Sequence, residues 1–107
     1  MNTLEQLYDV ILQRQREPQE GSYTCYLFEK GLDKILKKVG EECSETIIAA
    51  KNGNREEIVN EASDLIFHLL VMLANESISV SDVLEELEKR SGKISNLKQV
   101  KQTDKDT

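Results

Sequence analysis

Two helix-length patterns meet at the tripeptide Asn52-Gly53-Asn54, and this turn is the feature that most limits how the chain folds. Apolar residues recur every three or four positions from Leu32 to Lys51, and a second such pattern runs from Arg55 to about Asn75. Glycine commonly ends a helix and asparagine commonly begins one, so we expect two long helices folded back as an antiparallel hairpin. The expected buried stripe of the first long helix consists of Leu32, Ile35, Leu36, Val39, Cys43, Thr46, Ile47 and Ala50.

Shorter helical patterns lie on both sides of this hairpin. We expect a first helix that is capped by Asn2 or Thr3 and ends at about Arg16. We expect a last helix from Val83 to about Arg90, capped by Ser79 or Ser81. Between the first helix and the hairpin, residues 21–28 read as a loop that leads into a short helix ending near Gly31.

These elements predict one all-α domain over residues 1–92, a helical bundle built on the long antiparallel hairpin and completed by dimerisation. Aromatic residues make up only 5% of the chain and Trp is absent, which argues against a β-sandwich. Residues 65–73 are apolar nearly all round apart from His68, and so short a chain has little with which to cover them, which indicates a subunit interface. We expect the polar tail at 93–107 to be flexible.

Four carboxylates lie symmetrically about Gly53. Glu42 and Glu45 precede it by eleven and eight residues, and Glu61 and Asp64 follow it by eight and eleven. In a hairpin that rises about 1.5 Å per residue, Glu45 therefore faces Glu61, and Glu42 faces Asp64. Facing carboxylates repel one another unless a cation lies between them, and oxygen ligands favour Mg²⁺ or Mn²⁺. The spacing predicts a divalent metal site that works with substrate phosphates.

A solvated acidic face is the plain alternative, since runs such as Glu41, Glu42 and Glu45 are common on exposed helices. Glu61 and Asp64 weigh against it, because they lie at the edge of the most apolar helix, where an unpaired charge is costly. We therefore favour the metal site.

Three groups near the carboxylates have two interpretations each. Lys37 and Lys38 either form ion pairs with the glutamates one turn later or reach a phosphate oxygen. The segment Ser22-Tyr23-Thr24 forms either a helix cap with a packing aromatic ring or a flap over a substrate. His68 either orients a carboxylate or is a core histidine bonded to a nearby acceptor.

Charge and motif content exclude several functions. The net charge of −6 comes without a dominant basic patch, so we expect no nucleic-acid partner. Cys25 and Cys43 lack CxxC spacing, so we expect neither a zinc site nor a disulfide framework, and Cys43 is interpreted as a small core residue. With no signal peptide and no apolar run long enough to span a membrane, we expect a cytoplasmic protein. Among nucleophiles, the residue set supports water activated by a metal ion.

Three stretches of the chain together resemble the phosphoribosyl-ATP pyrophosphohydrolase family, an all-α branch of the MazG-like NTP pyrophosphohydrolase superfamily. They are residues 37–45 (KKVGEECSE), 50–54 (AKNGN) and 61–71 (EASDLIFHLLV), and Ser22-Tyr23-Thr24 supports them. The resemblance covers about residues 1–92, which is the whole expected domain.

This resemblance implies an Mg²⁺-dependent homodimeric enzyme that converts phosphoribosyl-ATP and water to phosphoribosyl-AMP and pyrophosphate, the second step of histidine biosynthesis. It implies Glu42, Glu45, Glu61 and Asp64 as metal ligands; Glu41 or Glu45 is then the group that orients or deprotonates the attacking water. Two alternatives are a pyrophosphohydrolase of the same superfamily that removes noncanonical nucleoside triphosphates, and a noncatalytic helical module that only dimerises.

Overall fold

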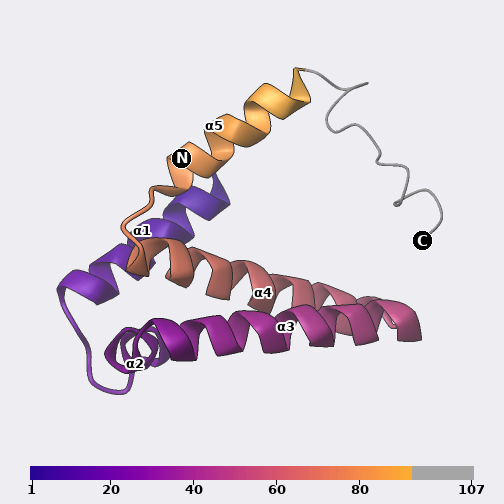
Figure 1. Ribbon diagram of the computed structural model, residues 1–107, viewed down its shortest axis with the longest axis horizontal. Helices are drawn as coiled ribbons and strands as arrows, with labels where there is room; N and C mark the ends of the chain where they lie inside the picture. Colours follow the sequence, from indigo (N-terminus) through magenta and orange to yellow (C-terminus); the bar gives the residue numbers. More distant parts are fainter. Residues whose placement is uncertain (93–107) are drawn as a thin grey trace.

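The computed structural model describes residues 1–92, and the tail predicted at 93–107 lies outside them. Within this part of the chain every regular element is a helix, so the all-α prediction is confirmed (Figure 1). The helices are α1 (Thr3–Arg16), α2 (Tyr23–Lys30), α3 (Leu32–Asn52), α4 (Arg55–Asn75) and α5 (Val80–Ser91).

The predicted hairpin is formed by α3 and α4, which lie antiparallel and side by side (Figure 1). Gly53 ends α3 in the left-handed conformation, with φ of 71°, and its N–H donates to the carbonyls of Ala49 and Ala50. Asn54 begins α4, because its side chain accepts a hydrogen bond of 3.1 Å from the Glu57 N–H. The turn tripeptide thus satisfies the backbone groups at both helix ends.

Two glycine substitutions in α3 are expected to change the stability of the fold in opposite directions. Gly53→Ala lowers the free energy of unfolding by about 1 kcal/mol, because a Cβ at positive φ is strained. Gly40→Ala lies in the helix interior, where a Cβ meets no atom of the described chain within 4 Å, and it raises the same quantity by up to about 1 kcal/mol. Urea unfolding of the two variants beside the wild type measures both effects. A destabilised Gly40→Ala would mean that another molecule packs against this position.

Two of the shorter helices begin earlier than predicted. The hydroxyl of Ser22 accepts a hydrogen bond of 3.2 Å from the Cys25 N–H, so α2 already starts at Tyr23 and the expected loop at 21–28 is wrong beyond residue 22. Ser79 likewise accepts a hydrogen bond of 3.1 Å from the Ser81 N–H, and α5 starts at Val80 rather than residue 83. In both places the serine cap decides where the helix begins.

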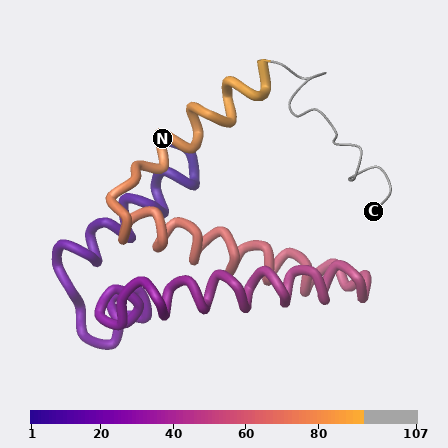
Figure 2. The backbone as a smooth tube through the Cα atoms, viewed as in Figure 1, coloured from indigo at the N-terminus to yellow at the C-terminus, as the bar shows by residue number. Residues whose placement is uncertain are grey.

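The end of the hairpin away from its turn is covered by α1 and α2, and α5 packs against α1. Figures 1 and 2 show α1 and α2 at that end and α5 leading away from it, while the half of α3 and α4 nearer the turn projects beyond them. The core accordingly lies at the covered end, and its buried members are Tyr8, Ile11, Leu27, Ile35, Leu70, Val71, Ala74 and Val80.

About half of the residues predicted to form the buried stripe of α3 are exposed in the described chain, so the prediction is wrong for them. Within the described chain Leu36 is 44% exposed and Ile47 is 69% exposed, and Cys43 is exposed instead of being a core residue. The face that packs against α4 is centred on Ile35, Glu42 and Ala49, each seven residues from the next. Periodicity located the apolar side of the helix, but it could not determine which part of this wide sector would meet α4.

The apolar segment of α4 is covered largely by its own chain. Leu70 and Val71 are buried, whereas Ile66 remains 43% exposed. None of the helices within residues 1–92 is by itself long and apolar enough to cross a membrane. Only α4 and α5 counted together, across a bend of 118°, reach the required length and composition.

Candidate metal centre

Three of the four predicted carboxylates come together between the two long helices. Glu42 and Glu45 extend from α3, and Glu61 extends from α4. Each of the three side chains offers one carboxylate oxygen, and these three oxygens lie within 4.8 Å of one another. At this spacing they could bind a single metal ion. The i, i+3 spacing on α3 and the antiparallel hairpin together produce this carboxylate trio.

Asp64 lies outside the trio, on the exposed surface of α4. Three residues advance a helix by about 300°, which leaves its Cβ direction roughly 60° away from that of Glu61, and its side chain is one methylene shorter. Its charge is nevertheless close enough to raise the pKa of Glu42. Asp64 is therefore an electrostatic neighbour of the trio, and its role as a metal ligand stays a prediction.

The trio contains oxygens that need a positive partner. The Glu42 residue is only 5% exposed, and both Glu42 Oε2 and Glu61 Oε2 are buried without a hydrogen-bond partner among the described residues. A buried ionised oxygen without a donor or cation is costly. Hard oxygen donors in this arrangement fit Mg²⁺ or Mn²⁺.

The pKa values show how the trio behaves without a cation. A hydrogen bond to Glu45, followed by burial, raises the pKa of Glu61 to about 7. Burial, followed by the Glu45 carboxyl, raises the pKa of Glu42. The pKa of Glu45 is lowered, because this carboxylate accepts hydrogen bonds from Glu61 first and Glu42 second. A proton at Glu61 thus takes the place that a cation would occupy, and Glu45 remains the ionised member.

We expect the metal-free protein to lose thermal stability as the pH rises from 5 to 8. The pKa of Glu61 is raised from 4.5 to about 7 on folding, so the folded state holds this proton more tightly than the unfolded chain. The resulting stabilisation is complete below the unfolded value of 4.5 and is lost as the pH rises through about 7. Thermal melts in EDTA measure the trend, and millimolar Mg²⁺ should raise the melting temperature more at pH 8 than at pH 5. Glu61→Gln should flatten the trend, and an unchanged slope in this variant would contradict the assignment.

Glu41 and the lysines lie beside the trio rather than in it. Lys38 Nζ lies 3.2 Å from Glu41 Oε2 and 3.9 Å from Glu42 Oε1. Of the two interpretations of Lys38, the geometry therefore matches ion pairs with the glutamates. The hydrogen bond to Glu41 raises the pKa of Lys38. Lys37 is exposed to solvent. Contact of either lysine with a phosphate stays a prediction.

The start of α2 is tied to the same region through the middle residue of the segment Ser22-Tyr23-Thr24. Ser22 is the helix cap, and Thr24 is half-buried in the first turn. Between them, Tyr23 Oη lies 2.8 Å from Nε2 of the buried His68. The position of His68 one turn after Asp64 was the signal in the sequence for a bond of this histidine near the carboxylates. Its partner Tyr23 could not be identified from that signal, because the two residues lie 45 positions apart.

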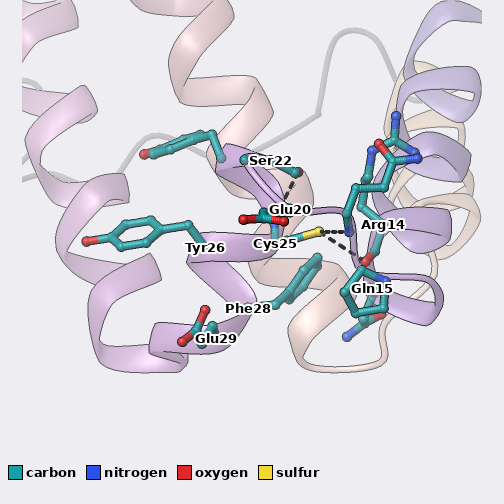
Figure 3. A pocket seen from close by; sticks show the side chains of 12 residues that line it. Arg14, Gln15, Glu20, Ser22, Cys25, Tyr26, Phe28 and Glu29 are labelled. Atoms are coloured by element: carbon teal, nitrogen blue, oxygen red, sulfur yellow. Dashed lines mark hydrogen bonds between the residues drawn. The ribbon is translucent and has the colours of Figure 1, made fainter.

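A cavity of about 890 Å³ lies between the end of α1 and α2, next to this tyrosine (Figure 3). Cys25 stands in its middle, where its Sγ donates to the Arg14 carbonyl and accepts from the Gln19 N–H. The size is within the range of small-molecule sites, about 300 to 1,000 Å³. Its walls are formed by Arg14, Gln15, Pro18, Gln19, Glu20, Gly21, Ser22, Tyr23, Cys25, Tyr26, Phe28 and Glu29.

Known proteins with similar sequences form a consistent group. A family model described as phosphoribosyl-ATP pyrophosphohydrolase matches residues 4–91. A phosphoribosyl-ATP pyrophosphatase of Listeria welshimeri is 58% identical over 101 residues, which cover 94% of this chain and 97% of the relative. Enzymes of the same name from Clostridium acetobutylicum and Lactiplantibacillus plantarum are 56% and 52% identical. Those alignments cover 90% and 92% of this chain, and 87% and 92% of the relatives.

Proposed function

The chain belongs to the phosphoribosyl-ATP pyrophosphohydrolase family, and we propose that it hydrolyses phosphoribosyl-ATP to phosphoribosyl-AMP and pyrophosphate in histidine biosynthesis. The observation that carries the proposal is the carboxylate trio of Glu42, Glu45 and Glu61, with its two unpartnered buried oxygens. A divalent cation held by such carboxylates can also bind the phosphates of a nucleotide that contains a phosphoanhydride.

Glu42, Glu45 and Glu61 would hold Mg²⁺ or Mn²⁺, with Asp64 as a further candidate ligand. When bound, the ion supplies positive charge against the phosphates and acidity for water. Glu45 is the better of the two candidates to orient or deprotonate that water, because it belongs to the carboxylate trio that would hold the ion. Glu41, the other candidate, is held in a hydrogen bond with Lys38.

A substrate panel tests the assignment. With Mg²⁺ present, we expect faster turnover of phosphoribosyl-ATP than of dUTP or dCTP, with pyrophosphate as the released product. Reaction in ¹⁸O-labelled water identifies the attacked phosphorus, because the label enters only one product. Faster turnover of dUTP or dCTP would instead favour the pyrophosphohydrolase of noncanonical nucleotides. If calorimetry detects no binding of Mg²⁺ or Mn²⁺, the protein is the noncatalytic helical module.

The functional unit that we propose is a cytoplasmic homodimer. Near the turn the hairpin has only two helices, as Figure 1 shows, and along its length α3 and α4 carry five aliphatic side chains that the described chain leaves exposed, here called the apolar patch. Exposed apolar residues that gather on one surface mark a protein interface. A second copy that packs its own hairpin on this patch would complete the bundle. The patch consists of Leu36, Ile47, Ile48, Val59 and Ile66.

A further inference from the structure

His68 is a buried polar side chain beside the carboxylate trio that the proposed reaction does not use. Its Nδ1 lies 2.7 Å from the backbone oxygen of Asp64, and its Nε2 lies 2.8 Å from Tyr23 Oη. A carbonyl oxygen can only accept, so Nδ1 carries the proton, and Nε2 of the neutral ring accepts from the tyrosine hydroxyl. Directed hydrogen bonds therefore join the first residue of α2 to α4 at the level of Asp64.

Tyr23 links the cavity to α4. It is one of the residues that line the cavity, and its ring stacks on Tyr26 and Phe67, with centroids 6.1 and 6.2 Å away. Burial raises the pKa of its hydroxyl; Lys38 lowers this pKa and Glu42 raises it, so the hydroxyl is within electrostatic range of the metal centre. Tyr23 is 45% exposed, and within the described chain the hydrogen bond of its hydroxyl is the one to His68.

The composition of the cavity indicates which part of a nucleotide it would accept. Aromatic rings of Tyr23, Tyr26 and Phe28 on its walls suit the flat face of a base. Glu20 and Glu29 also line it, and their charges disfavour a phosphate while they can accept hydrogen bonds from ribose hydroxyls.

We propose that His68 is a positioning residue that acts through Tyr23: it holds the first turn of α2 against α4, so that the cavity that Tyr23 helps to line receives the nucleoside part of the nucleotide. The identity of this ligand rests on the proposed function. Within the described chain the link makes no hydrogen bond to the side chains of Glu42, Glu45 or Glu61, so its loss should weaken nucleotide binding more than it slows the chemical step.

Steady-state kinetics with phosphoribosyl-ATP and saturating Mg²⁺ test the link. Tyr23→Phe keeps the ring and removes the hydroxyl, and it should raise KM about tenfold, as expected for one hydrogen bond, with little change in kcat. His68→Asn should have the same effect, because asparagine can reach the Asp64 carbonyl but not Tyr23. His68→Gln places an amide oxygen near the position of Nε2, so it should recover a KM near that of the wild type.

The two His68 variants are a matched pair, since both lose the ring and its packing. If His68 acts through Tyr23, the double variant His68→Asn/Tyr23→Phe is no worse than either single variant. Tyr8→Phe is the control for stability alone, because Tyr8 donates to the Ile78 carbonyl, far along the chain from the trio. It should lower the melting temperature and leave KM unchanged. Equal KM values for His68→Asn and His68→Gln, or fully additive effects in the double variant, would overturn the proposal.

Hydrogen exchange separates this link from the proposed reaction. In the nucleotide-free protein, amides of α2 should exchange faster in Tyr23→Phe and His68→Asn than in the wild type or in Tyr8→Phe. If the wild type does not hydrolyse phosphoribosyl-ATP, the proposed function fails and this readout decides the link alone. Unchanged α2 exchange in both variants would overturn it.

Discussion

The Glu61→Gln variant is expected to lose at least about 10³-fold in kcat, because the trio forfeits a charged ligand that contributes about 4 kcal/mol to transition-state stabilisation. The substitution preserves side-chain size, so the helical content should equal that of the wild type. It also removes the group whose pKa is raised to about 7, so the metal-free variant should melt no lower than the wild type at pH 8. Initial rates, circular dichroism and titration calorimetry with Mg²⁺ measure these three properties.

Glu56→Gln is the matched control for this experiment. It removes one carboxylate from the same helix, at an exposed position in the first turn outside the trio. We expect its kcat and its affinity for Mg²⁺ to stay near those of the wild type. Wild-type turnover by Glu61→Gln would refute the metal centre, and equal loss in both variants would trace the effect to total charge instead.

The second large effect is expected from Ile47→Glu, which should convert the proposed dimer to a monomer at micromolar concentrations. Ile47 is 69% exposed in the single chain, so the charge costs the monomer little. In a symmetric interface the same substitution buries two unpaired carboxylates, at several kcal/mol each, and weakens association by at least about 10³-fold. Light scattering coupled to size-exclusion chromatography measures the mass directly.

Val10→Glu provides the control for the dimer experiment. Val10 is also an exposed aliphatic residue, at 46%, but it lies on α1 and outside the apolar patch of the hairpin. The Val10→Glu protein should retain the mass of the wild type. A wild type that is monomeric at all concentrations would contradict the dimer, and an Ile47→Glu dimer would place the interface elsewhere.

Local sequence determined the hairpin and the heights of its carboxylates. The turn needs only a glycine at φ of 71° and an asparagine that caps the next helix, and both groups act within a few residues of Gly53. Once the turn is set, counting residues along two rods places Glu45 and Glu61 at one level. Elsewhere α2 and α5 begin earlier than predicted, although Ser22 and Ser79 were both candidate caps, because more than one residue near each start could cap the helix.

Rotation of each helix about its axis was decided by tertiary packing. The apolar sector of α3 is wider than one neighbour can cover, so periodicity alone did not show that Glu42 is buried against α4 while Ile47 faces outward. The rotation of α4 likewise brings Glu61, rather than Asp64, to the carboxylates of α3. The bond between Tyr23 and His68 joins residues 45 positions apart, and no local pattern encodes such a pair. Local rules determine the distance along a helix axis, but the direction in which a side chain points between helices depends on everything packed around it.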